Sequence, residues 1–168
     1  IHQYFSTPSI GGKTRSYEFS KYLVKNGHEV IMITSHNGCH YRKEIIEGIE
    51  VHWIPCFYVN HMSVLRRFFS FFSFMIKSSW RALFIKKVDI SYVTSTPLSV
   101  GFVALFLKFF KRYPYIFEVR DLWPEVPVQF NVIRSNFLKR LAYGFEKTIY
   151  KYSESVVALS PGMEEGVL

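Results

Sequence analysis

The chain has 168 residues, of which 49% are hydrophobic and 20% are charged, and its formal net charge is +8. This apolar content excludes an intrinsically disordered chain, and the length suits one domain with its own core. The positive charge favours anionic partners such as nucleic acid, anionic lipid or phosphorylated small molecules. Because the basic residues are scattered, with clusters at 66–67 and 108–112, the sequence argues against a nucleic-acid-binding arm.

In chain order, the pattern predicts a helix over 14–25, a strand over 28–34 and a strand over 48–55. The last of these alternates as a half-buried strand does, with Ile49, Val51 and Trp53 on one face. A strand over 88–94, a helix over 98–110, a strand over 115–119, a helix over 136–152 and a short strand over 155–159 follow. Strands alternating with helices predict a doubly wound parallel sheet, hence a single Rossmann-like α/β domain over 1–168. Residues 45–47 and 48–53 could alternatively form a small hairpin at one edge.

The segment over 64–81 is predicted to be a helix that is both aromatic and basic. One face carries polar residues: Arg66, Ser70, Ser73, Lys77 and Arg81. The other is apolar, with Phe68, Phe69, Phe72, Met75, Ile76 and Trp80, and Phe71 and Phe74 lie at the boundary. The apolar stretch is far shorter than the roughly 20 residues that a membrane span needs. We expect most of the apolar face to pack on the sheet and some phenylalanines to contact lipid or a lipid-linked acceptor.

Polar residues follow the predicted strand over 115–119 directly, namely Arg120, Asp121, Trp123 and Glu125. In an open parallel sheet, ligands bind at the carboxyl ends of the strands, so this is a candidate functional site. The alternative is a salt-bridged loop in which Trp123 fills the core.

A glycine loop, Gly11-Gly12-Lys13-Thr14, separates the start of the chain from the first helix. Backbone amides and a helix N-terminus in this position can bind phosphate. The second half of a P-loop motif is present, but Thr7 stands where that motif has its first glycine. Three interpretations therefore remain: a phosphate-contacting loop, a nucleoside-triphosphatase loop, or a tight turn that needs glycine for its backbone angles.

Cys39 and Cys56 are the only cysteines, and no C-x-x-C spacing supports a zinc or redox motif. Two isolated thiols suggest a reducing compartment. No paired-histidine zinc motif and no serine-hydrolase motif is present. The chain opens as if a strand were already under way and closes as if a helix had just begun, so we expect it to be a fragment of a longer protein.

Three segments together resemble glycosyltransferase family 4. The glycine pair followed by a helix and Asn26-Gly27-His28-Glu29-Val30 resembles the opening of that family. The segment Phe117-Glu-Val-Arg-Asp-Leu-Trp-Pro-Glu125 resembles the branch that builds bacterial surface polysaccharides, often with amino sugars. Val157-Ala-Leu-Ser-Pro-Gly-Met163 resembles the last strand before the domain crossover. The resemblance implies the N-terminal half of a GT-B architecture, with the donor-binding C-terminal domain missing.

The resemblance also implies site residues. Many members have His-Asp where this chain has Arg120-Asp121, which leaves open whether Arg120 takes over the contact of the histidine. The implied catalytic residues are Asp121 and Glu125, and the implied donor-phosphate or substrate contacts are Gly11, Gly12, Lys13 and Arg120. The residues expected to face the acceptor or the membrane are Arg66, Arg67, Phe71, Phe74 and Lys77. No metal site and no cofactor are expected, and the nucleotide-diphosphate sugar is a substrate.

The sequence thus leads to one principal hypothesis and two alternatives. The principal one is a retaining glycosyltransferase that moves a hexosyl or amino-sugar unit from a nucleotide-diphosphate sugar to a polyprenyl-diphosphate-linked saccharide. Such an enzyme would be cytoplasmic and peripheral on the inner face of the cell membrane, contacting anionic lipid but not nucleic acid. The fragment alone is expected to be inactive. The alternatives are a P-loop-like nucleotide-binding enzyme and a membrane-peripheral binding module without catalysis.

Overall fold

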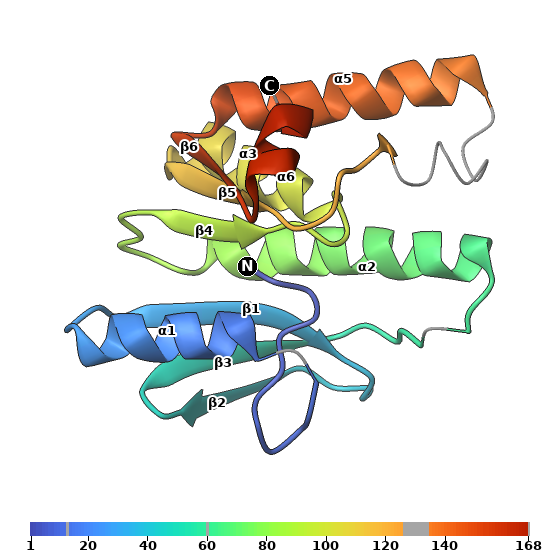
Figure 1. Cartoon of the computed structure of the whole chain (residues 1–168). Helices are drawn as coiled ribbons and strands as arrows, with labels where there is room; N and C mark the ends of the chain where they lie inside the picture. The colour runs from blue at the N-terminus through green and yellow to red at the C-terminus, as the bar shows by residue number, and fades with distance from the viewer. Residues whose placement is uncertain (13, 60, 126–134, 168) are drawn as a thin grey trace. The chain divides into compact units, whose positions relative to one another are not determined.

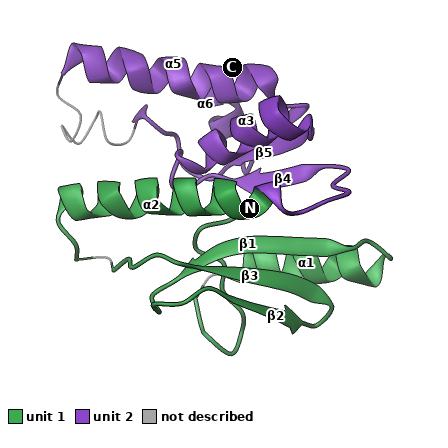
Figure 2. Ribbon diagram, turned by 180° about the vertical axis from the view of Figure 1, so that it is seen from behind, with its two compact units in different colours: residues 1–82 green, residues 83–168 purple. Residues whose placement is uncertain are grey.

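A computed structural model of the chain describes residues 1–12, 14–59, 61–125 and 135–167 (Figure 1). Helices and strands alternate along the chain, and the strands fall into two three-stranded sheets. The chain divides into two compact units, residues 1–82 and residues 83–168, which Figure 2 distinguishes by colour.

The first unit contains a mixed sheet with the strand order β1-β3-β2. Its elements are α1 (Arg15–Lys25), β1 (Val30–His36), β2 (Arg42–Ile46), β3 (Ile49–Pro55) and nearly all of α2 (Val64–Leu83). Strand β3 pairs in parallel with β1 and antiparallel with β2. The start of the chain lies alongside β1, because the His2 amide donates to the Ile33 carbonyl and the Ser35 amide donates to the Gln3 carbonyl. The antiparallel pairing of β2 with β3 confirms the edge hairpin that the sequence left as an alternative.

Strand β3 is buried on both of its faces. Ile49, Val51 and Trp53 belong to the core cluster, as the alternation predicts. On the opposite face His52 and Ile54 are also buried, so the expectation of a half-buried strand is wrong. Alternation marks one buried face correctly, but it cannot show that a second element covers the other face.

The second unit contains a parallel sheet with the strand order β4-β5-β6. Its elements are β4 (Ser91–Thr94), α3 (Val100–Lys111), β5 (Tyr115–Val119), α5 (Asn136–Tyr152), β6 (Ser155–Ala158) and α6 (Pro161–Val167). Helix α3 packs against β4, β5 and α5. It approaches α5 closely at Gly101, where a Cβ atom would lie 2.2 Å from Cδ1 of the buried Ile149. The Rossmann-like α/β class is confirmed, and a single domain over 1–168 stays a prediction.

Helix α2 buries a different face from the one that its composition suggests. Its buried residues are Ser70, Phe74, Ser78, Ser79 and Ala82. Phe68, Phe69 and Trp80 are about two-thirds exposed, at 69%, 70% and 66%. The expectation that most of the apolar face packs on the sheet is therefore wrong. The Ser78 hydroxyl finds its partner within the helix by donating to the Phe74 carbonyl at 2.6 Å, so its burial leaves no hydroxyl unsatisfied.

Candidate functional site

The polar residues after β5 meet those after β4, because the two strands are parallel neighbours and end at the same edge. The Thr96 hydroxyl donates to Oδ2 of Asp121 at 2.6 Å. The amide of Arg120 donates to the buried Ser95 hydroxyl at 2.8 Å, and the Ser95 amide donates to the Glu118 carbonyl. The hydrogen bond from Thr96 holds the carboxylate of Asp121 in position, and the carboxylate remains accessible because Asp121 is exposed.

Thr96 has a backbone conformation that β-branched residues rarely adopt, with φ of +93°. Strained residues of this kind persist where the surrounding structure determines them, and they cluster at functional sites. Here the strained residue is the one that holds Asp121. The role of Thr96 is not predicted from the sequence, because an isolated threonine before a proline carries no recognisable signal.

A second polar group surrounds Glu125 in the same unit. The Tyr143 hydroxyl donates to Oε2 of Glu125 at 2.5 Å, and this hydrogen bond raises the pKa of Tyr143. Burial raises the pKa of Glu146; the hydrogen bond from Tyr150 opposes this effect, and the charge of Glu125 adds to it. The Tyr150 hydroxyl donates to Oε1 of Glu146 at 2.9 Å. A carboxyl group with a raised pKa can hold a proton nearer to neutral pH, which suits general acid-base chemistry.

Glu146 and Tyr143 are not among the residues predicted from the sequence. A helical pattern alone could not reveal them, because their significance depends on Glu125, which lies 18 residues before Tyr143. Trp123 is only half-buried, which disfavours the alternative in which it fills the core.

Residues 7–11, which lead into the glycine loop, form a tight turn in the first unit. Gly11 and Gly12 have φ of +81° and +100°, which explains the glycines in conformational terms. The amides of Ile10 and Gly11 both donate to the Thr7 carbonyl, at 3.0 and 3.1 Å, so these two amides are used within the loop. A P-loop instead directs its amides at phosphate, so this geometry disfavours the nucleoside-triphosphatase alternative. Lys13 lies outside the described residues.

The five residues predicted to face an acceptor or a membrane do not share one environment. Arg66 and Lys77 are exposed, Arg67 and Phe71 are partly buried, and Phe74 is fully buried with 0% exposure. Phe71 stacks on Tyr58, with ring centroids 5.8 Å apart. The prediction for Phe74 is thus wrong, because it lies in the row of small residues by which α2 is buried.

Across the described ranges, no helix is long and apolar enough to cross a membrane. The same ranges hold no group of three or more histidine, cysteine or acidic side chains that could bind a metal ion. Both cysteines are free thiols; Cys39 is exposed and Cys56 is buried.

Comparison with known proteins places this fold in a family. The model of glycosyltransferase family 4 matches residues 10–168, and the chain belongs to that family. Among solved structures, the chain is similar to sucrose-phosphate synthase from Thermosynechococcus elongatus, with a TM-score of 0.63 and 15% sequence identity. The match covers 98% of this chain and 39% of that one, so this chain spans well under half of the matched protein. At this identity the likeness concerns the fold. No curated protein matches the sequence.

Proposed function

We propose that the chain is the acceptor-binding half of a retaining glycosyltransferase of bacterial surface-polysaccharide synthesis. Its donor would be a nucleotide-diphosphate sugar, and its acceptor a polyprenyl-diphosphate-linked saccharide at the cytoplasmic face of the membrane. Family membership supports sugar transfer in general. The narrower choice of substrates rests on the motif around Arg120 and Asp121, on the net charge of +8 and on the exposed aromatic face of α2.

The observation that carries the proposal is the hydrogen bond from Thr96 to Asp121 at the shared edge of β4 and β5. A carboxylate fixed in this way can accept a hydrogen bond from a sugar hydroxyl without first being ordered. Glu125, with Tyr143 and Glu146 beside it, is a second candidate for proton transfer or hydroxyl binding. Arg120 could offset phosphate charge.

The test is transfer by the full-length enzyme from UDP-glucose or UDP-N-acetylglucosamine to farnesyl-diphosphate-linked N-acetylglucosamine. Asp121→Asn should lower kcat about 100-fold or more, as expected when a positioned polar contact to the reacting sugar is lost. Asp89→Asn is a matched control, because Asp89 is an exposed aspartate in the same unit. Wild-type transfer by Asp121→Asn would remove Asp121 from the site.

Peripheral binding to anionic membrane is part of the proposal. Phe68, Phe69, Phe72 and Trp80 are exposed on α2, and Arg66 and Lys77 are exposed on the same helix. Exposed aromatic side chains beside basic ones suit the interface of an anionic bilayer. The same observation supports the second candidate function, a membrane-binding module without catalysis.

Vesicle co-sedimentation tests the membrane contact. The protein should sediment with phosphatidylglycerol vesicles and much less with phosphatidylcholine vesicles. Replacing Phe68 and Phe69 with serine should abolish most of this binding, whereas Phe110→Ser should not, although Phe110 is 72% exposed on α3. Equal loss in both variants would contradict a specific role for α2. Retained vesicle binding by an enzyme with no transfer to any acceptor would favour the non-catalytic module.

A further inference from the structure

A pocket of about 360 Å³ lies in the first unit between the end of β3 and the C-terminal half of α2. Its walls combine aliphatic and aromatic side chains with two cations: Tyr41, Ile54, Pro55, Ile76, Lys77, Trp80 and Arg81. Four of these residues form two i, i+4 pairs on α2, so they are neighbours on one helix surface. One pair, Ile76 and Trp80, is apolar, and the other, Lys77 and Arg81, is cationic.

Both cations are held in position. Nζ of Lys77 donates to the Pro55 carbonyl at 2.7 Å. Nε of Arg81 donates to Nδ1 of His52 at 2.9 Å, and the guanidinium lies over the Tyr41 ring at 4.8 Å from its centroid. A guanidinium has further N–H groups on its two terminal nitrogens, and their planar fork matches the oxygens of a phosphate group. Arg81 is therefore bound through one edge and by stacking, which orients the other donors.

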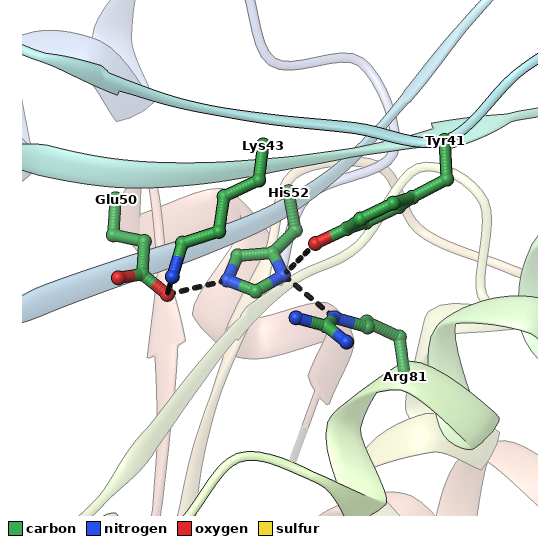
Figure 3. A network of polar contacts seen from close by, with 5 residues as sticks. All are labelled: Tyr41, Lys43, Glu50, His52 and Arg81. Carbon is green, nitrogen blue, oxygen red and sulfur yellow. Dashed lines mark hydrogen bonds and ion pairs between the residues drawn. The ribbon is translucent and has the colours of Figure 1, made fainter.

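His52 is the residue that positions Arg81, and Figure 3 shows its contacts. Because arginine can only donate, Nδ1 of His52 is the acceptor, and the proton lies on Nε2, which donates to Oε1 of Glu50 at 2.7 Å. Nζ of Lys43 lies 2.8 Å from the same carboxylate oxygen, and the Tyr41 hydroxyl lies 2.9 Å from Nδ1. This network joins β2, β3 and α2, and it holds Tyr41 and Arg81, the two of its members that line the pocket.

We propose that this pocket binds the head of a single-chain amphiphile that carries a phosphate ester. The two cations suit a head with a charge of about −1.5 to −2, which a phosphate monoester has and a carboxylate lacks. The mainly apolar walls suit the first part of the chain, and the exposed Trp80 and Ile76 continue into the aromatic face of α2. The volume is at the lower end of the range for ligand pockets, so it favours one chain over two.

This inference rests on the proposed function for its setting, a lipid-linked substrate at a membrane, but it concerns residues of the first unit, whereas Asp121 and Glu125 belong to the second. The two can fail separately, because the pocket is tested with a monomeric ligand and without sugar transfer. A protein that binds vesicles and transfers sugar but does not bind the monomeric ligand would contradict this inference alone.

The experiment is calorimetric titration of the full-length protein with farnesyl phosphate below its critical micelle concentration. We expect saturable binding with one site, and at least tenfold weaker binding of farnesol and of inorganic phosphate. Trp80→Ala and Lys77→Gln should each weaken binding at least fivefold. Lys25→Gln, which removes one exposed charge from α1 in the same unit, should change it less than twofold.

Three results would overturn the inference. Equal binding of farnesol would show that the protein does not recognise the phosphate group. Equal binding of inorganic phosphate would show that it does not recognise the hydrocarbon chain. An equal loss in Lys25→Gln and Lys77→Gln would show attraction by net charge instead of a site. Arg81→Gln removes the hydrogen bond to the buried His52, and this variant could fail to fold for that reason. Trp80 and Lys77 are exposed, so their variants decide the test in that case.

His52→Gln separates positioning from direct contact. If His52 only orients Arg81, this variant should weaken farnesyl phosphate binding and leave farnesol binding unchanged. Unchanged binding of both ligands would show that Arg81 does not need His52.

Discussion

Helices α2 and α3 are both rich in phenylalanine, and both expose several of these side chains. On α3, Phe109 and Phe110 are 59% and 72% exposed, and the buried residues are aliphatic or small, with Val100, Val103 and Ala104 at 0%. On α2 the buried residues are mostly serines, with Phe74 as the large one. Helix α3 thus buries an aliphatic face, whereas α2 buries mainly small residues and makes hydrogen bonds to His52 and Pro55 of β3.

The difference shows that composition does not reveal how a helix is attached. Apolar packing stabilises α3 in proportion to the area that it buries. Helix α2 buries one large side chain, makes specific hydrogen bonds from Arg81 to His52 and from Lys77 to Pro55, and exposes Phe68, Phe69 and Phe72. The predictions below test this difference, beginning with the largest expected effect.

Phe74→Ala should destabilise the protein most, by about 3–5 kcal/mol, because it empties the one large buried position on α2. Phe68→Ala is the matched control on the same helix, and at 69% exposure it should change stability by less than about 0.5 kcal/mol. Urea unfolding followed by circular dichroism measures both. Equal losses would mean that the burial of α2 is not centred on Phe74.

Gly101→Ala should destabilise the second unit by about 1–3 kcal/mol, because the new methyl group would lie 2.2 Å from Cδ1 of Ile149. Gly144→Ala on α5 is the control, since nothing lies within 4 Å of its Cβ position. In a helix interior that change should stabilise by up to about 1 kcal/mol. Thermal unfolding of the two variants should shift in opposite directions, and a shared direction would contradict the close approach of α3 and α5.

Stability should fall as the pH drops from about 7.5 to about 5, because of His52. Burial is the largest effect and lowers its pKa; the hydrogen bond with Glu50 opposes burial, and the charge of Arg81 adds to the lowering. The folded state therefore favours the neutral ring, whereas the unfolded chain takes up a proton near pH 6.5. The contribution of His52 to the free energy of unfolding is complete above that pH and is lost as the pH falls towards its folded-state pKa.

The pH effect has a direct control in His52→Gln. Groups that face this ring are Tyr41, Lys43, Glu50 and Arg81. Urea unfolding between about pH 5 and pH 8 should show that the free energy of unfolding depends more steeply on pH in the wild type than in His52→Gln. The difference in slope should correspond to the uptake of no more than one proton. Parallel pH profiles would indicate that other groups cause the dependence.

Ser78→Ala should have the smallest effect, below about 1 kcal/mol, although Ser78 is fully buried. Its hydroxyl bonds to the Phe74 carbonyl within the same helix, and alanine keeps the small volume and favours the helix. Val103→Ala at an equally buried position of α3 should cost about 1–3 kcal/mol. Similar losses at the two positions would contradict the distinction between the helices.

Much of the fold could be predicted from the sequence. The helix over 136–152 and the strand over 115–119 have the predicted bounds, since their periodicity and their flanking residues agree. The placement of Arg120 and Asp121 after β5 followed from the same pattern. The partners of the site did not follow: Thr96 reaches Asp121, and Tyr143 reaches Glu125, only through the tertiary structure.

The sequence by itself determined the order of elements, the α/β class and the core face of β3, because these depend on periodicity and local backbone preference. The tertiary structure decided which face of α2 is buried, that His52 orients Arg81, and that Thr96 holds Asp121. The last two outcomes depend on contacts between residues that are 29 and 25 positions apart in the sequence. Such contacts are set by how whole elements pack, and no local pattern of residues encodes them.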